Sequence, residues 1–150
     1  MSTQENLDAY EVVVVGGGPA GQMAAMYSTR LGHRTALVGR GGGRAAMMQE
    51  VHNMIGIPEE TSGNELLATG KEQLEAYGCT VQRDMITSCE RTDDETVRLS
   101  GNNSTYEAEY VVLARGSRTC ARTHHFPGLA ADYTTVCTVT HTCSSTSPCT

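Results

Sequence analysis

The sequence lacks a long apolar run and a recognisable targeting segment. No stretch approaches the roughly 20 apolar residues that a membrane-spanning helix needs, so no membrane partner is predicted. The opening segment, MSTQENLDAY, is polar and does not combine a basic start with an apolar core, so it is not typical of a signal peptide. We therefore expect a cytoplasmic protein, in a compartment where thiols stay reduced.

Basic residues are scarce as well. Lysine and arginine together number 11 against 17 aspartates and glutamates, which leaves a net charge of −6, and no basic stripe stands out. An acidic chain repels phosphate backbones, so no nucleic acid partner is predicted. The length of 150 residues is typical of a single domain, and internal repeats are absent.

The cysteines do not form a recognisable redox or metal motif, although four of the six lie within residues 120–150. One grouping has a spacing that matches no structural zinc site: Cys137, His141, Cys143 and Cys149. A dithiol of Cys137 and Cys143 is an alternative, but it lacks the short spacing that lowers a thiol pKa at the start of a helix. We predict no metal site, and we interpret residues 118–150 as an irregular, partly disordered tail rich in Cys, Thr and Ser.

A strand, a helix and a second strand are encoded in the stretch EVVVVGGGPAGQMAAMYSTRLGHRTALV. Val12–Val15 form a continuous β-branched run, which is typical of a strand buried on both faces. From Pro19 to Leu31 apolar residues recur at helical steps, and Gly32 follows as a stop signal. The run RTALV predicts the second strand, so the whole stretch predicts a βαβ unit with two parallel strands.

Three glycines with the spacing Gly-x-Gly-x-x-Gly link the first strand to the helix. Gly16 permits a tight turn, Gly18 has no side chain that would block a pyrophosphate, and Gly21 lets helix and strand approach closely. The free N–H groups of the first helical turn, aided by the helix dipole, then bind the pyrophosphate. In this strand–turn–helix context the motif predicts a dinucleotide-binding loop.

The end of the second strand departs from the usual pattern of such a unit. A carboxylate normally stands there to take the ribose hydroxyls, whereas this sequence has Gly39 followed by Arg40. Arg40 could meet a phosphate, which keeps an NADP-binding protein open as an alternative. The other interpretation is a solvated arginine beside a flexible glycine loop.

Further elements follow the βαβ unit. We expect one helical turn around residues 45–49 and an amphipathic helix over 64–78 with its apolar face formed by Leu66, Leu67, Leu74 and Tyr77. Four strand-like segments follow, at 79–84, 86–91, 95–100 and 105–114. The alternation in TVRLS and the turn GNNS predict an antiparallel meander, and the buried run EYVVLA returns the chain to the parallel sheet.

Taken together, these segments resemble the amino-terminal FAD-binding part of the thioredoxin reductase-like flavoproteins, which are pyridine nucleotide-disulfide oxidoreductases. GGGPAG is characteristic of that family, and VHNMIGIP matches its Val-x-Asn before a Gly-x-Pro turn. DMI matches the strand that passes the adenine, and YEAEYVVLARGS matches the family's A-x-x-V-I-x-A-T-G. The resemblance covers residues 10–117 and implies an α/β fold: a Rossmann-like FAD-binding domain with a parallel sheet, a βαβ unit and a small antiparallel β-meander, preceded by a polar tail over 1–9.

The resemblance implies FAD as the cofactor and NAD(P)H as a candidate electron donor. It places Asn53 near the flavin and Ile86 by the adenine. It places three residues at the edge of the FAD: Ala114, Arg115 and Gly116. No residue is assigned a catalytic role. The expected cofactor-binding residues are Gly16, Gly17, Gly18, Pro19, Ala20, Gly21, Gly39, Arg40, Asn53, Ile86, Ala114 and Gly116.

Three departures from the family pattern limit what the resemblance implies. Besides Gly39, Arg115 stands where the family has threonine, and the redox Cys-x-x-Cys is missing. The sequence also lacks the family's NAD(P)H-binding domain, so we expect a truncated, FAD-binding portion of such an oxidoreductase. A homodimer and a separate partner subunit both stay open. The alternatives are a non-catalytic nucleotide-binding remnant and a stand-alone NAD(P)-binding protein.

Overall fold

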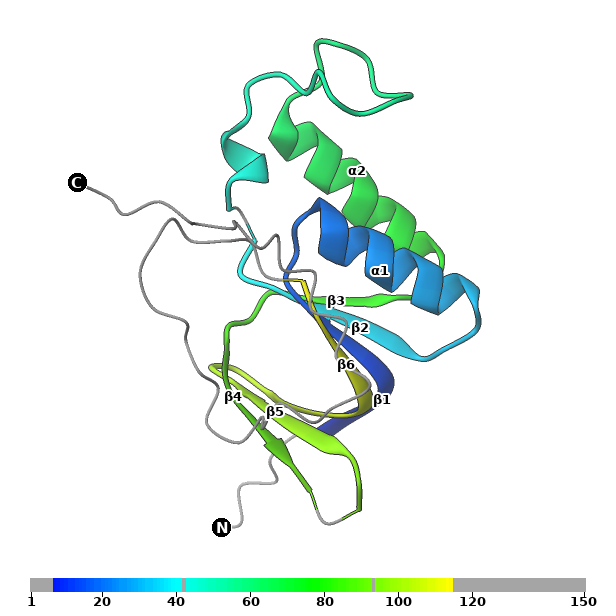
Figure 1. The fold of residues 1–150 in the computed structure, drawn as a ribbon, viewed down its shortest axis with the longest axis vertical. Helices are drawn as coiled ribbons and strands as arrows, with labels where there is room; N and C mark the ends of the chain where they lie inside the picture. The colour runs from blue at the N-terminus through cyan, green and yellow to red at the C-terminus, as the bar shows by residue number, and fades with distance from the viewer. Residues whose placement is uncertain (1–6, 42, 93, 115–150) are drawn as a thin grey trace, which may run out of the picture.

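The computed structural model describes residues 7–41, 43–92 and 94–114, which form a six-stranded mixed sheet with two α-helices against one of its faces (Figure 1). The order of strands across the sheet is β3-β2-β1-β6-β5-β4. The elements in chain order are β1 (Leu7–Val15), α1 (Pro19–Arg30), β2 (Thr35–Val38), the 3₁₀ turn η1 (Ala45–Met47), α2 (Gly63–Ala76), β3 (Thr80–Gln82), β4 (Ile86–Arg91), β5 (Val97–Gly101) and β6 (Thr105–Leu113). The predicted α/β fold class is confirmed.

The parallel half of the sheet contains β3, β2, β1 and β6. α1 connects β1 to β2, and α2 lies in the connection from β2 to β3. Val12 pairs with Thr35 and Val15 with Val38, which aligns the carboxyl ends of the first two strands. The predicted βαβ unit is therefore present, with its helix starting at Pro19 as expected.

The other half of the sheet is the predicted antiparallel meander of β4, β5 and β6. The GNNS turn joins β5 to β6, and within it the Gly101 amide donates a hydrogen bond to the Ser104 carbonyl at 2.9 Å. β6 belongs to both halves, because it pairs antiparallel with β5 and parallel with β1. This shared strand joins the meander to the parallel sheet, as the buried run EYVVLA predicted.

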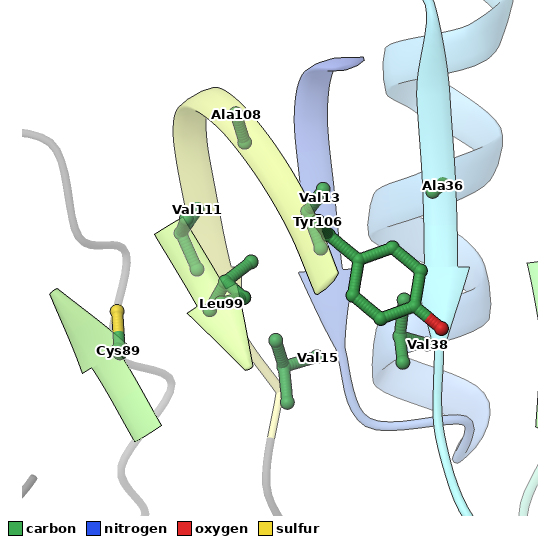
Figure 2. Close-up of a cluster of buried hydrophobic side chains, with 9 residues drawn as sticks. All are labelled: Val13, Val15, Ala36, Val38, Cys89, Leu99, Tyr106, Ala108 and Val111. Atoms are coloured by element: carbon green, nitrogen blue, oxygen red, sulfur yellow. The ribbon is translucent and has the colours of Figure 1, made fainter. Parts of the chain in front are cut away.

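Two hydrophobic cores lie on opposite faces of the sheet, which explains the continuous valine run in β1. Val12 and Val14 pack on the face that the helices cover, and Val13 and Val15 pack on the face toward the meander. Figure 2 shows the meander-side cluster, with the Tyr106 ring lying next to Val38. That cluster comprises Val13, Val15, Ala36, Val38, Cys89, Leu99, Tyr106, Ala108 and Val111.

Two local expectations differ from the structure. β1 begins at Leu7, so residues 7–9 belong to the sheet rather than to the polar tail, because the first half of β6 offers them pairing partners. α2 ends at Ala76, and Tyr77 is its C-cap with 57% of its side chain exposed. Leu74, which belongs to the same predicted apolar face, is fully buried. The apolar face of α2 therefore packs on the core through Leu74, and Tyr77 does not contribute to this packing.

Candidate dinucleotide-binding site

The carboxyl ends of four parallel strands meet at one edge of the sheet (Figure 1). Backbone hydrogen bonds tie the segments that leave these strands to one another. Gly16 donates to the Val38 carbonyl at 2.8 Å, and Gly39 donates to the Gln82 carbonyl at 3.0 Å. Ala114, directly after β6, donates to the Val15 carbonyl at 2.9 Å. Residues 16, 39 and 114, which are far apart in the sequence, are thereby held at the same edge.

This edge contains the point at which the strand order reverses. From β1 the chain moves one way across the sheet to β2 and β3, and it later returns on the other side of β1 as β6. α1 and α2 pack on one face, whereas the β4–β5 hairpin packs toward the other. In open α/β sheets a crevice forms at such a switch point, outside the carboxyl ends of the strands, and ligands bind there. The glycine loop between β1 and α1 lies at this point.

The first and third glycines of the motif are required by the backbone. Gly16 has a φ of 125°, a conformation that side chains with a Cβ rarely adopt. A Cβ atom at Gly21 would overlap the carbonyl oxygen of Gly16 and would lie 3.3 Å from the Cβ of Ala114. Gly21 thus allows α1 to pack directly against the ends of β1 and β6, as its place in the motif predicted.

Within the described part of the chain the space beside Gly18 is open, whereas the space beside Gly21 is filled by the Gly16 carbonyl and the Ala114 side chain. Among the described residues, a Cβ at Gly18 would meet no atom within 4 Å, so this part of the chain leaves the space beside Gly18 open to a ligand. Gly18 is also the N-cap of α1, where no side chain caps the helix, and the first turn holds no acidic residue. The N–H groups of this turn and the positive end of the helix dipole therefore remain available to an anion, and the loop fits a pyrophosphate.

The amino terminus of α2 is arranged in the opposite way. The Ser62 hydroxyl accepts a hydrogen bond from the Glu65 amide, and the Glu65 carboxylate accepts one from the Ser62 amide, which forms a capping box. Gly63 packs so closely on the Ala45 carbonyl that a Cβ there would overlap it. Of the two α-helices described, only α1 presents an uncapped amino terminus.

Gly39, at the end of β2, lies against the glycine loop. A Cβ at this position would be 2.5 Å from the Gly17 nitrogen and 3.0 Å from the Gly17 Cα. The Gly17 backbone therefore leaves no room for a side chain at position 39, which agrees with the absence of the expected carboxylate there. Beside it, the Arg83 Nε–H donates to the Arg40 carbonyl at 3.0 Å. Arg83 is not among the site residues predicted from the sequence, because no local pattern links it to residue 40.

The remaining predicted site residues lie in different surroundings. Asn53 is exposed and lines an open hollow of about 410 Å³ together with His52, Met54 and other residues between 51 and 59. Ile86 is partly buried against the meander-side core, so its place beside an adenine stays a prediction. Ala114 adjoins the glycine loop, and Gly116 lies outside the described residues.

A buried carboxylate that the sequence did not reveal holds the GNNS turn. Asp84 is only 5% exposed and accepts hydrogen bonds from the backbone amides of Met85 (2.7 Å), Asn102 (3.0 Å), Asn103 (3.2 Å) and Ser104 (3.2 Å) and from the Tyr106 hydroxyl (3.2 Å). Burial alone raises the pKa of this carboxyl, but the hydrogen bonds outweigh burial and hold the pKa below its ordinary value. Burial and the neighbouring Asp84 charge raise the pKa of Tyr106 to about 12.

The described residues offer no evident redox or metal chemistry of their own. Cys79 and Cys89 are buried free thiols whose pKa values burial raises, and they lie in different cores. Within residues 7–41, 43–92 and 94–114 no group of three or more His, Cys, Asp or Glu side chains could hold a metal ion. No helix in this part of the chain is long and apolar enough to cross a membrane.

Known proteins share this arrangement. The family model described as pyridine nucleotide-disulphide oxidoreductase matches residues 10–148. The chain is 28% identical over 134 residues to a thioredoxin reductase of Aquifex aeolicus (strain VF5), covering 85% of this chain and 42% of that protein. It is 33% identical over 112 residues to a thioredoxin reductase of Peptoclostridium litorale, covering 73% of this chain and 35% of that protein. A solved thioredoxin reductase structure from Gloeobacter violaceus has a TM-score of 0.71 at 25% identity, covering 77% of this chain and 37% of that one.

The fold and the glycine loop at its switch point define a Rossmann-like α/β domain, an architecture that in other proteins binds dinucleotides. Because the family model spans most of its length, the chain belongs to the pyridine nucleotide-disulphide oxidoreductase family, and its likeness to thioredoxin reductases confirms the predicted resemblance. The chain spans less than half the length of the relatives that it matches.

Proposed function

We propose that this chain forms the FAD-binding part of a thioredoxin reductase-like oxidoreductase. The observation that carries the proposal is the uncapped amino terminus of α1, with open space beside Gly18, at the switch point of the sheet. FAD contains the pyrophosphate that such a helix terminus binds. Membership of the family supports the choice of a flavin as the cofactor.

The chain's own residues divide between the two ends of the cofactor in this proposal. The backbone of residues 16–21, including Gly17, Pro19 and Ala20, holds the pyrophosphate. Gly39 and Arg40 lie on the adenosine side, where the resemblance also places Ile86. Asn53, Ala114 and Gly116 are assigned to the flavin side by the same resemblance. We assign the FAD-binding domain to residues 10–117 and place residues 118–150 outside it.

We propose the activity of a complete reductase only for longer proteins of this class. We assign no catalytic role to the side chains described in this chain. Bound FAD supplies the redox chemistry, with NAD(P)H as the electron donor, and the protein binds and orients it. The electrons must leave to an acceptor through groups other than Cys79 and Cys89, because both thiols are buried on opposite sides of the sheet. A homodimer or a partner subunit stays a prediction.

The experiment compares FAD binding by the wild-type chain with binding by Gly18→Val. The new side chain projects into open space, so the fold is expected to survive while the pyrophosphate loses its place. We expect the purified wild-type chain to show the visible flavin absorption band and Gly18→Val to bind FAD at least about tenfold more weakly.

Ala68→Val is the matched control, because it adds a branched side chain at an exposed position of α2. Circular dichroism should show the same helix content for both variants. A Gly18→Val chain that retains wild-type affinity for FAD would overturn the pyrophosphate assignment. A wild-type chain that binds no flavin would favour the non-catalytic remnant.

A further inference from the structure

The adenosine end of the proposed site lacks the side chain that ordinarily recognises the ribose. Domains of this architecture place a carboxylate at the end of the second strand, where it takes the ribose hydroxyls. Gly39 occupies that position, and its backbone lies so close to Gly17 that a Cβ would be 2.5 Å from the Gly17 nitrogen. A side chain at position 39 would have to displace the glycine loop, so this residue offers a ribose only its backbone groups.

The segment that follows β3 holds the segment that follows β2 through two hydrogen bonds. The Gly39 amide donates to the Gln82 carbonyl at 3.0 Å, which carries the β2–β3 pairing past the last residue of β2. The next residue, Arg83, donates from its side-chain Nε–H to the Arg40 carbonyl, also at 3.0 Å. The Arg83 Nε lies 3.9 Å from the point that a Cβ on Gly41 would occupy. Arg83 is therefore placed to fix two successive residues of the loop.

The loop that leaves β2 needs such an anchor because its own backbone is permissive. Residues 39–43 read Gly-Arg-Gly-Gly-Gly, and Gly41 has a φ of 73°, which residues with a Cβ rarely adopt. Among the described residues, the bond from Arg83 is the only hydrogen bond that reaches residue 40, 41 or 43. Ordering a glycine-rich loop costs conformational entropy, so an anchor that orders it beforehand lowers the cost of binding a ligand there.

We propose that Arg83 is a positioning residue for the adenosine half of FAD, and that it holds the backbone of Arg40 and Gly41 to take the ribose hydroxyls in place of a carboxylate. This inference rests on the proposed function, because the glycine loop must first hold the diphosphate. A hydroxyl both donates and accepts hydrogen bonds, so backbone carbonyl and N–H groups can satisfy it. The Arg40 carbonyl retains a lone pair when it accepts the bond from Arg83. The ligand class is an adenosine diphosphate with free 2′ and 3′ hydroxyls, which FAD contains.

The test compares two nucleotides that carry the same diphosphate and differ only in the ribose hydroxyls. The full chain is titrated by calorimetry with adenosine 5′-diphosphate and with its 2′,3′-dideoxy analogue. The wild type should bind adenosine 5′-diphosphate about tenfold more tightly, because the analogue leaves the backbone groups of the loop without partners. FAD is titrated separately in the same preparations.

Two substitutions at position 83 separate the hydrogen bond from the charge. Arg83→Met places a methyl group where arginine has Nε and so removes the donor, whereas Arg83→Gln keeps an N–H donor at the same distance along the side chain. Both remove the positive charge, which weakens the two nucleotides alike because they carry the same diphosphate, so the ratio of their affinities is the readout. We expect Arg83→Met to reduce the preference to less than about threefold and Arg83→Gln to retain it.

Arg98→Met is the matched control, because it makes the same change at an exposed arginine of β5 in the meander. The Arg98→Met chain should keep the wild-type preference for adenosine 5′-diphosphate over the dideoxy analogue.

Equal affinities of the wild type for the two nucleotides would overturn the inference, because the ribose hydroxyls would then not be recognised. A preference that survives in Arg83→Met, or that Arg83→Gln loses as fully as Arg83→Met does, would also overturn it, because the hydrogen bond to the loop would not be the cause. If FAD binds and any of these results is found, or if neither nucleotide binds, only this inference fails. If FAD does not bind either, the proposed function fails with it.

Discussion

Asp84 shows how much one side chain can contribute to the fold. Its carboxylate joins the segment after β3 to the turn between β5 and β6, which lies about twenty residues further along the chain. A Cβ on Gly101 would overlap the Asp84 carboxylate, so the turn and the carboxylate fit closely. Removing one partner of such a buried network leaves several amide donors without an acceptor, which costs more than the lost bonds themselves.

Asp84→Asn is expected to lower the free energy of unfolding by about 2–3 kcal/mol near neutral pH, because an amide cannot replace a charged acceptor of several donors. The hydrogen bonds hold the folded-state pKa of Asp84 below its ordinary value. Its stabilisation is therefore fully present above about pH 4 and is lost as the pH falls through the folded-state pKa. Urea unfolding of the wild type and of Asp84→Asn across this pH range should show that the difference between their free energies of unfolding shrinks in acid.

The control for this substitution is Asp94→Asn, which alters an exposed carboxylate in the link between β4 and β5. It should leave the unfolding midpoint nearly unchanged. Equal stability of wild type and Asp84→Asn at neutral pH would contradict the structural role of this carboxylate.

The two α-helices differ in how their amino termini are satisfied. α2 satisfies its own first-turn amides with the capping box of Ser62 and Glu65, and η1 packs on its first residue. α1 begins at Pro19 behind an uncapped Gly18. The uncapped terminus at the switch point of the sheet is the feature on which the ligand site proposed at α1 rests, whereas α2 covers the core.

Ser62→Ala should lower the free energy of unfolding by about 1 kcal/mol, because it removes the side-chain acceptor of the capping box. Thermal unfolding followed by circular dichroism measures the effect. Thr69→Ala, in the exposed part of the same helix, is the control and should not lower the unfolding temperature. If both substitutions had the same effect, the cap would not contribute to stability.

Across the whole molecule, the sheet separates two cores and the two described cysteines with them. Cys79 packs with the helices and Cys89 with the meander. Each thiol is buried, and burial raises its pKa, so the reactive thiolate is scarce in both cases. The sheet between them prevents a disulfide without unfolding.

Native alkylation followed by peptide mass spectrometry should therefore leave Cys79 and Cys89 unmodified, and both should react once urea unfolds the chain. A Thr69→Cys variant supplies an exposed thiol on α2 as the positive control. Labelling of either native cysteine as fast as this control, or a Cys79–Cys89 disulfide in the folded chain, would contradict the two-core arrangement.

Features that depend on neighbouring residues were predictable. The valine run of β1 indicated burial on both faces, and the structure confirms it. The motif explained Gly16 and Gly21, because their backbone constraints arise within the loop. The start of β1 at Leu7 could not be predicted, since its first residues are held in the sheet by pairing with β6, which local composition does not reveal. Asp84 likewise carried no local signal of its burial.

By itself, the sequence determined the βαβ unit, the glycine loop, the meander and the family to which the chain belongs, because periodicity, glycine spacing and turn residues act over a few neighbouring positions. Only the tertiary structure decided that Gly39 packs on Gly17, that Arg83 binds the carbonyl of a residue 43 positions away, and that Asp84 holds a distant turn. Such contacts depend on how the strands are ordered and aligned in the sheet, which no local segment specifies.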